Sequence, residues 1–294
     1  GLLEPPSRIA GGEILLSGER IDNLPATQMR KVRGKRIGMI FQDPLTSLNP
    51  LYRIGDQLTE TILTHERMSA AAARDKAEQL LVEVGIPAAG RRLSSYPHQF
   101  SGGMRQRVVI ALALAADPEL VIADEPTTAL DVSVQAQIIA LVKRLCKERG
   151  TAVMLITHDM GVIAETADRV CVLYAGRLAE IGTVGAVVKR PHHPYTAGLM
   201  AAIPSLADDL DARLAQIPGA MPRLDAIPKG CAFNPRCTYT FERCITERPG
   251  IYQTETSAVS CFLHDKAHPA PVENAGRAAE AGLLPLAAGA ERSP

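Results

Sequence analysis

Two adjacent carboxylates, Asp124 and Glu125, follow a short apolar segment and could bind a cation or direct a water molecule. Residues 120–123 are wholly apolar, which is typical of a parallel strand that is buried on both faces. Pro126 cannot donate a backbone hydrogen bond, so the strand is expected to end at the two acids. Open α/β sheets bind ligands at the carboxyl ends of their strands. One acid therefore suits Mg²⁺ and the other suits the activation of water; the alternative is a strand end whose acids only face solvent.

A second candidate site precedes this strand, where Ser101, Gly102 and Gly103 lead into an apolar segment over residues 108–116. Serine is a favourable helix N-cap, and glycines allow the backbone to approach a ligand closely. The first turn of a helix presents free N–H groups and the positive end of the helix dipole, and both favour a phosphate. The pattern predicts a phosphate contact at residues 101–103.

Two further polar side chains stand where strands are expected to end. Gln42 follows a predicted strand over residues 36–41, and His158 follows an apolar segment over residues 152–156. The carbonyl oxygen of a glutamine in this position can bind Mg²⁺; the alternative is an ordinary loop amide. Other histidines, including His192 and His193, are expected to be loop residues without assignable chemistry.

The order of these motifs resembles that of the ABC-type ATPases. Residues 41–43 resemble the Q-loop of that family, residues 101–107 its signature motif, and residues 120–125 its Walker B motif. Residues 129–131 (Ala-Leu-Asp) resemble the D-loop, and His158 resembles the switch histidine. The resemblance implies an α/β, P-loop NTPase fold that binds ATP and Mg²⁺.

The same resemblance implies a role for each site residue. Asp124 and Gln42 are expected to bind Mg²⁺, Glu125 to polarise the attacking water, and His158 to contact the γ-phosphate. Asp131 is expected to bind nucleotide. Ser101, Gly102 and Gly103 are expected to contact the nucleotide that is held by an opposite subunit.

Three segments resemble one subfamily, the ATPases of oligopeptide and dipeptide importers. They are residues 43–50 (Asp-Pro-Leu-Thr-Ser-Leu-Asn-Pro), residues 192–196 (His-His-Pro-Tyr-Thr) and residues 230–237. The resemblance implies an ATPase that energises peptide uptake across the inner membrane and sits peripherally on its cytoplasmic face. Implied partners are a homologous ATPase subunit in a homo- or heterodimer, two transmembrane permease subunits and, indirectly, a periplasmic solute-binding protein. A nickel importer is an alternative, as is a soluble ABC protein of DNA repair or translation.

The composition agrees with a protein that reaches a membrane only through a partner. Among 294 residues, Lys+Arg and Asp+Glu both number 32, so the charge balance does not favour a nucleic-acid partner. No apolar run approaches the ~18 residues of a transmembrane helix, and no signal peptide is present. The chain is therefore expected to be cytosolic.

No G-x-x-x-x-G-K-[S/T] phosphate-binding loop occurs in the sequence. The family carries this loop, and the strand before it, upstream of the point that corresponds to Gly1. We therefore expect a nucleotide-binding domain over residues 1–182 that is N-terminally incomplete, does not hydrolyse ATP alone and is poorly soluble. The absent strand is expected beside the strand over residues 120–123. The alternative is a subunit that does not hydrolyse ATP and donates only its signature motif to a partner.

Four cysteines form the other chemical constellation, with the spacing C-x5-C-x6-C-x16-C over Cys231, Cys237, Cys244 and Cys261. A cytosolic location argues against disulfides, and the lack of a C-x2-C pair argues against a zinc ribbon. Four thiolates can hold zinc or an iron–sulfur cluster, so the spacing predicts a metal site without naming the metal. The resemblance implies a structural [4Fe–4S] cluster, with zinc as the alternative.

The remaining expectations concern domain organisation. A helical subdomain is expected over about residues 45–116, a cysteine-rich C-terminal extension over residues 183–265, and a disordered tail over residues 266–294, which lacks aromatic residues. Cys146 and Cys171 stand alone in an expected helix and strand, and both are expected to be buried.

Overall fold

The computed structural model describes residue 3 and residues 6–127, 131–203 and 216–284. Contacts divide the chain into two units, residues 1–158 and residues 159–294, which are described separately here. This division differs from the predicted boundary after residue 182. The sequence predicts that a hairpin of residues 170–174 and 177–181 closes the nucleotide-binding domain. In the structure this hairpin shares a sheet with strands of the C-terminal extension.

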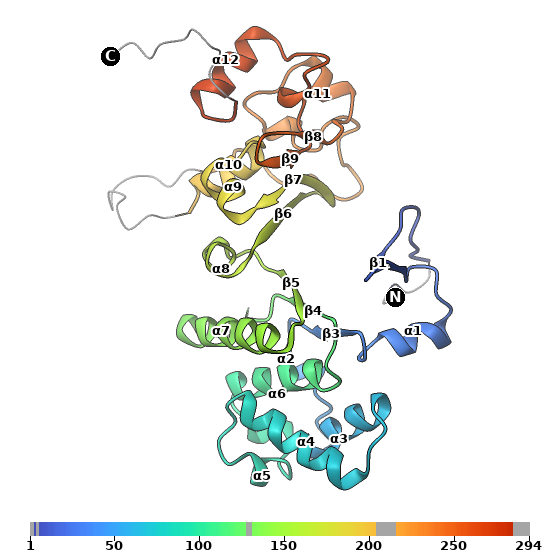
Figure 1. Ribbon diagram of the computed structural model, residues 1–294. Coiled ribbons are helices and arrows are strands. Elements are labelled where there is room, and N and C mark those ends of the chain that lie inside the picture. The colour runs from blue at the N-terminus through green and yellow to red at the C-terminus, as the bar shows by residue number, and fades with distance from the viewer. Residues whose placement is uncertain (1–2, 4–5, 128–130, 204–215, 285–294) are drawn as a thin grey trace. The chain divides into compact units, whose positions relative to one another are not determined.

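A parallel three-stranded sheet forms the centre of the first unit, as expected for an α/β fold (Figure 1). Its strands are β3 (Ile37–Ile40), β4 (Leu120–Asp124) and β5 (Ala152–Ile156), in the order β3-β4-β5. Residues Val121 and Ala123 of β4 are fully buried. All three strands have the same direction, so their carboxyl ends, with the polar residues that follow them, lie at one edge of the sheet.

Both edges of β4 are occupied by neighbouring strands, so the expectation of an absent strand beside β4 is wrong for this sheet. Within the described residues, β5 has only one neighbour and therefore an open edge. Its apolar side chains are unusually accessible, with exposed fractions of 41% for Val153, 52% for Met154 and 46% for Ile156. Strands of parallel sheets are normally covered on both faces, so β5 is the incompletely covered strand of this unit.

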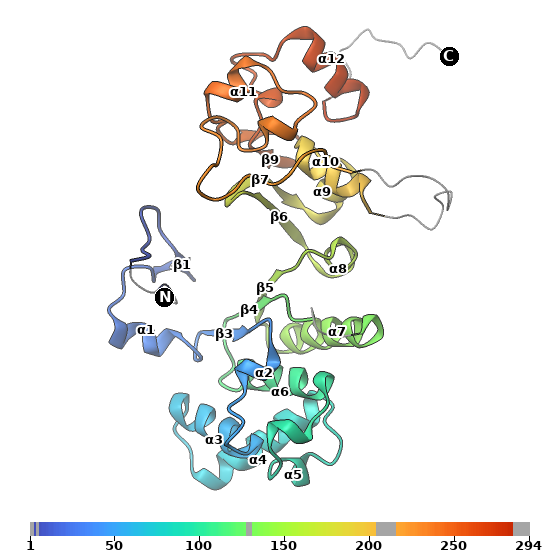
Figure 2. The ribbon, with the colours of Figure 1, turned by 180° about the vertical axis from the view of Figure 1, so that it is seen from behind.

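Helix α6 connects the sheet with a layer of helices and packs against both (Figures 1 and 2). The helices of the first unit are α1 (Ala26–Val32), α2 (Pro44–Ser47), α3 (Ile54–His65), α4 (Ala70–Glu83), α5 (Ala89–Arg92), α6 (Gly102–Leu114) and α7 (Val132–Arg149), with a 3₁₀ turn η1 at Pro97–Gln99. A short hairpin of β1 (Leu15–Leu16) and β2 (Glu19–Arg20) precedes them. One hydrophobic core runs from α3 and α4 through α6 to β4 and α7.

The sequence predicts Ser69 as a helix N-cap and Gly85 as the residue that follows the end of the same helix. Ser69 caps α4 by accepting a hydrogen bond from the Ala72 amide, and Gly85 adopts the positive φ expected after that helix. Gly150 ends α7 in the same conformation. The prolines that bracket residues 43–50 predict a loop. The structure instead has the single helical turn α2 there, which the Asp43 carboxylate caps by accepting from the Leu45 amide.

The second unit is built on an antiparallel sheet in the order β6-β7-β9-β8. The strands are β6 (Arg169–Tyr174), β7 (Arg177–Thr183), β8 (Tyr252–Gln253) and β9 (Ser257–Val259). Its helices and 3₁₀ turns are α8 (Met160–Thr166), α9 (Val184–Lys189), α10 (Pro194–Ala201), η2 (Asn234–Arg236), α11 (Glu242–Thr246), η3 (Phe262–His264) and α12 (Val272–Glu280). Cys171 lies exposed on β6, which corrects the prediction that it is buried, whereas Cys146 on α7 is buried as expected.

Residues 266–284, expected to be disordered, contain α12 and a buried apolar residue beyond it. Ala278 and Leu283 are essentially inaccessible and pack with Leu263, which lies two residues after Cys261. The Asn274 amide also donates hydrogen bonds to the carbonyls of Tyr239 and Thr240. These non-local contacts order a segment whose composition alone favours disorder, while residues 285–294 lie outside the described residues.

Leu283→Ala is expected to release this C-terminal segment. Truncation of a fully buried leucine costs about 2–5 kcal/mol, which corresponds to a rise of roughly 30-fold or more in the rate of local opening. Amide hydrogen exchange over α12 measures this opening, and Val272→Ala is the matched control because Val272 is 90% exposed. Unchanged protection of α12 in the Leu283 variant would show that the segment does not depend on this contact.

No helix within the described residues is both long and apolar enough to span a membrane.

Candidate nucleotide and cysteine sites

The two carboxylates stand at the end of β4, and the backbone at Glu125 is strained. Asp124 is the last residue of the strand and is half-buried. Glu125 has φ of +42°, a conformation that residues other than glycine rarely adopt. Its amide donates to the Ile156 carbonyl across a distance of 2.9 Å, which attaches the turn after β4 to the end of β5. Strain of this kind occurs where surrounding structure holds a functional side chain in one orientation.

The structure brings three of the predicted site residues together around the Glu125 carboxylate. Gln42, which follows β3, donates from Nε2 to Glu125 Oε2 at 2.9 Å. His158, which follows β5, has Nδ1 3.2 Å from Glu125 Oε1. Because an ionised carboxylate can only accept, Nδ1 of His158 carries the proton and Nε2 is left available. The amide oxygen of Gln42 is likewise left to accept a cation.

The candidate signature residues lie at the start of α6. Ser101 is the N-cap, and its Oγ accepts a hydrogen bond from the Met104 amide at 3.3 Å. The structure gives a reason for glycine at position 103 that the sequence does not reveal. A Cβ atom at this position would lie 3.0 Å from Cγ1 of Val134 on α7. Gly102 is exposed and could be approached by a ligand. The glycine pair therefore serves close helix packing at one position and leaves open backbone at the other.

The expected D-loop is only partly within the described residues. Asp131 is exposed and occupies the N-cap position of α7, while residues 129 and 130 lie outside the described ranges. Arg107 joins α6 to its neighbours, with Nη1 2.6 Å from the Val84 carbonyl and Nη2 3.3 Å from Oε1 of Gln137 on α7. The helices that carry the signature and D-loop segments are therefore connected by packing and by hydrogen bonds.

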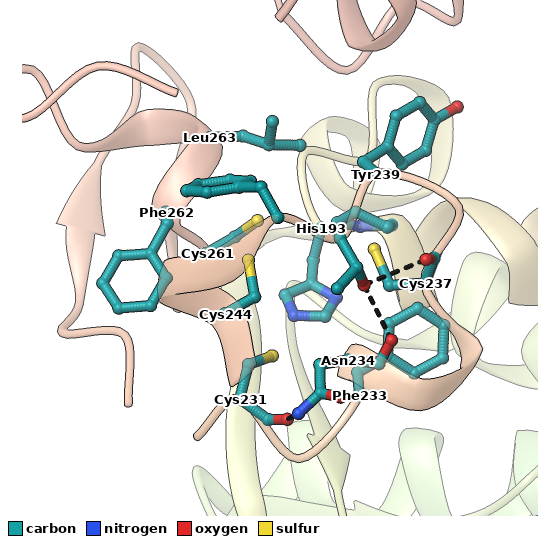
Figure 3. A pocket seen from close by; sticks show the side chains of 13 residues that line it. His193, Cys231, Phe233, Asn234, Cys237, Tyr239, Cys244, Cys261, Phe262 and Leu263 are labelled. Carbon is teal, nitrogen blue, oxygen red and sulfur yellow. Dashed lines mark hydrogen bonds between the residues drawn. The ribbon is translucent and has the colours of Figure 1, made fainter. Parts of the chain in front are cut away.

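All four cysteines of the C-terminal constellation line one cavity in the second unit (Figure 3). Cys231 lies shortly before η2 and Cys237 directly follows it. Cys244 lies in α11, and Cys261 is the residue before η3. Burial raises the pKa of every one of these thiols, to about 11 at Cys237 and well above its usual value at Cys261. The thiols are therefore neutral unless a cation favours their ionisation.

Backbone N–H groups are directed at the sulfur atoms. Cys231 accepts from Phe233, Cys237 from Tyr239, and Cys261 from Leu263, in each case from the residue two positions later. Such hydrogen bonds lower the thiol pKa and stabilise metal-bound thiolates. The donor chemistry thus fits a thiophilic metal. As the side chains stand, however, the described residues contain no group of three or more His, Cys, Asp or Glu at metal-ligand spacing, so ligation would require the thiolates to draw together.

His193, which the sequence left without a role, also lines this cavity. It is only 4% exposed, and burial is the main reason that its pKa is lowered to about 3. Its Nδ1 accepts from the Tyr195 amide at 3.0 Å, so it caps α10. The only sequence signal for this position was its place in the His-His-Pro-Tyr-Thr segment, which does not reveal proximity to cysteines more than 35 residues away.

The fold is that of an ATP-binding cassette. The structure matches the dimeric cassette MJ0796 in a post-hydrolysis state bound to ADP and phosphate, with a TM-score of 0.54 and 30% identity over 60% of this chain and 75% of that chain. It also matches cbiO1 from Clostridium perfringens, part of the ABC transporter complex cbiONQ, with a TM-score of 0.54 and 27% identity over 64% and 71% of the respective chains.

Sequence comparison identifies the family. Residues 1–128 match the ABC transporter family, and residues 179–244 match the oligopeptide/dipeptide transporter C-terminal region. The chain is 50% identical to the oligopeptide transport ATP-binding protein OppD of Bacillus subtilis, over 88% of this chain and 73% of that protein. It is 49% identical to the dipeptide transport ATP-binding protein DppD of the same organism, over 90% and 80%. The chain therefore belongs to the ATP-binding proteins of the oligopeptide/dipeptide ABC transporter family.

Proposed function

We propose that this chain is the subunit that binds and hydrolyses ATP to energise uptake of oligopeptides or dipeptides across the inner membrane. The observation that carries the proposal is the convergence of Gln42, Glu125 and His158 at the carboxyl ends of three parallel strands. The substrate class rests on the relatives, among them OppD of Salmonella typhimurium, which is 49% identical over 85% of this chain and 74% of that protein.

In this proposal the strand-end residues divide the work of hydrolysis. Asp124 and the amide oxygen of Gln42 hold Mg²⁺, which neutralises charge on the phosphates when it is bound. Glu125 accepts a hydrogen bond from the attacking water and orients it towards the γ-phosphate. His158, whose Nδ1–H is held by Glu125, presents Nε2 to a γ-phosphate oxygen. Hydrolysis of this kind depends on positioning and electrostatic stabilisation, so these contacts must be present together.

The signature residues act on a nucleotide held by a second, homologous subunit. Ser101 and Gly102 lie at the exposed start of α6. Asp131 lies at the start of α7, and α7 packs against α6. This arrangement suits an ATP sandwiched between two subunits in a homo- or heterodimer. Two transmembrane permease subunits complete the transporter, which places the chain on the cytoplasmic face of the membrane and links it indirectly to a periplasmic solute-binding protein.

We further infer that Cys231, Cys237, Cys244 and Cys261 ligate a structural [4Fe–4S] cluster, with zinc as the alternative metal. Four thiols facing one cavity and amide N–H groups directed at their sulfurs support this inference. When bound, the metal supplies positive charge and joins the four chain segments that carry the cysteines.

Deletion of the gene tests the transport function in cells. A strain auxotrophic for one amino acid is expected to stop growing when that amino acid is supplied as an oligopeptide or dipeptide. Growth on the free amino acid should be unaffected, and the wild-type gene should restore growth on the peptide. Loss of nickel uptake with normal growth on peptides would instead identify a nickel importer, and unchanged growth and unchanged nickel uptake would contradict an importer role.

A further inference from the structure

The cavity that the four cysteines line is too small to admit most solutes (Figure 3). Its volume is about 20 Å³, which is room for about one water molecule. Alkylating agents and chelators are larger than water, so they reach the sulfur atoms in the cavity only when part of its lining moves away. The part of the lining that moves most readily therefore sets how fast the thiols react with them.

Different hydrophobic clusters support the cysteines. Cys231 and Cys237 pack on the cluster around Phe233, which includes side chains of β6 and β7. Cys261 packs on a second cluster, and Tyr239 packs on the same one. The buried members of this second cluster are Leu263, Ala278 and Leu283. The sheet thus supports the first two cysteines, whereas α12 and the turn after it support Cys261.

Helix α12 also supports the cavity lining through Tyr239. Nδ2 of Asn274 donates hydrogen bonds to the carbonyl oxygens of Tyr239, at 3.1 Å, and Thr240, at 3.3 Å. The guanidinium carbon of Arg277 lies 5.8 Å from the centre of the Tyr239 ring, which is a cation–π contact. Tyr239, Thr240 and Leu263 line the cavity, and none of the described residues 272–284 does. Helix α12 therefore lies behind these lining residues, on the side away from the cavity.

The turn after α12 is attached to the sheet through His192. The carbonyl of Leu283 can only accept, so Nδ1 of His192, 3.3 Å away, donates to it. The His192 amide donates to the carboxylate of Glu180 on β7 at 3.0 Å, and the His193 amide does so as well. Glu180 is inaccessible to solvent, which strengthens these hydrogen bonds. A hydrogen bond from an anchored histidine thus fastens the end of the α12 segment.

The support behind Cys261 is smaller than the support behind the other two cysteines. Among the described residues, the cluster that α12 joins has three buried members, and the cluster under Cys231 and Cys237 has seven. Local opening begins where the fewest apolar side chains are buried. Residues 272–284 are therefore expected to move away from the cavity lining before the sheet does.

We propose that residues 272–284 form a removable cover over the part of the four-cysteine site that contains Cys261. In the closed arrangement of the structure, the cover keeps solutes away from this thiol. When the cover opens, Leu263 and Tyr239 lose the side chains packed behind them, and the cavity becomes accessible. The consequence for metal retention rests on the proposed metal site, whereas protection of the thiol is a property of the chain without metal.

Two substitutions loosen the cover in different ways. Leu283→Ala removes a fully buried side chain from the second cluster. Asn274→Asp keeps the size of the side chain but replaces the amide donor with a carboxylate oxygen that faces two carbonyls. The matched controls are Val272→Ala and Val272→Asp, which make the same kinds of change at a residue that is 90% exposed.

The first measurement is the rate at which N-ethylmaleimide alkylates each cysteine of the reduced, metal-free protein, followed by mass spectrometry. Leu283→Ala is expected to raise the rate at Cys261 about 30-fold or more, as for the opening of α12. Asn274→Asp is expected to raise it about tenfold, because two hydrogen bonds are lost. Cys231 should change much less, since it packs on the other cluster, and both Val272 variants should match the parent.

The second measurement is the transfer of iron or zinc from the purified protein to an excess of chelator, which both cover variants are expected to accelerate. Wild-type protein without iron or zinc would remove the metal site, and alkylation of Cys261 would still test the cover. Equal alkylation of Cys261 in the parent and in both cover variants would overturn the inference, with or without metal. An equal rise at all four cysteines would overturn it as well, because α12 would then support the whole site rather than cover Cys261.

Discussion

Glu125→Gln is expected to lower the rate of ATP hydrolysis by about two to three decades while ATP binding persists. The substitution removes the negative charge that orients and polarises water, and the loss of one such group costs about 2–4 kcal/mol of the barrier. Glutamine keeps the size of the side chain. Its amide oxygen can accept from either Gln42 or His158, and its NH2 group can donate to the other partner after a flip of the Gln42 amide or a change of His158 tautomer. The architecture of the site should therefore survive, and only the chemical step should slow.

The measurement is steady-state phosphate release together with equilibrium binding of ATP, on a form of the protein that carries a phosphate-binding loop. Glu148→Gln is the matched control, because Glu148 lies exposed on α7 in an i,i+4 ion pair with Arg144. This control should hydrolyse ATP at the parent rate. Hydrolysis by the Glu125 variant within threefold of the parent would remove Glu125 from the proposed role.

Single Cys→Ser exchange at each position of the constellation is expected to abolish metal binding. The four sulfurs line one cavity, and the described residues contain no group of three or more ligands at metal spacing that could replace a lost thiolate. Cys146→Ser and Cys171→Ser should bind metal as the wild type does, since both residues lie outside the cavity. The C-terminal extension should also become less stable in each of the four variants, because binding energy of the metal contributes to its folding.

Iron and acid-labile sulfide per chain, with zinc assayed on the same sample, distinguish the possible metals. Iron with matching sulfide supports the cluster, whereas stoichiometric zinc without sulfide would replace the cluster with a zinc site. Absence of both metals, with all four thiols freely alkylated in the native protein, would contradict the metal proposal.

Patterns local in the sequence predicted much of the first unit. Apolar segments located β4 and β5, and β3 lies within the strand predicted over residues 36–41. Parallel strands bring their carboxyl ends together, so the proximity of Gln42, Glu125 and His158 followed from topology. Capping residues such as Ser69 and Gly85 marked helix ends for a similar reason, since a cap depends only on backbone within a few residues.

Features that depend on distant segments were missed or misjudged. The helix α12 is ordered by burial of Leu283 against the segment around Cys261, which composition cannot indicate. The open edge of β5 and the occupied edges of β4 depend on strand order, which apolar runs do not encode. Cys171 was expected to be buried because its residue type often is, yet its side of β6 is exposed.

By itself, the sequence determined the class of fold, the candidate catalytic residues and the four cysteines, because each depends on residue type and on spacing along the chain. Only the tertiary structure decided that the cysteines share one cavity and that His193 lies among them. It also decided that Glu180 holds the turn carrying His193 from the sheet. These relations join segments that are distant in the sequence, and their energy comes from burial and from hydrogen bonds formed only when β7, β9 and the cysteine segments pack together.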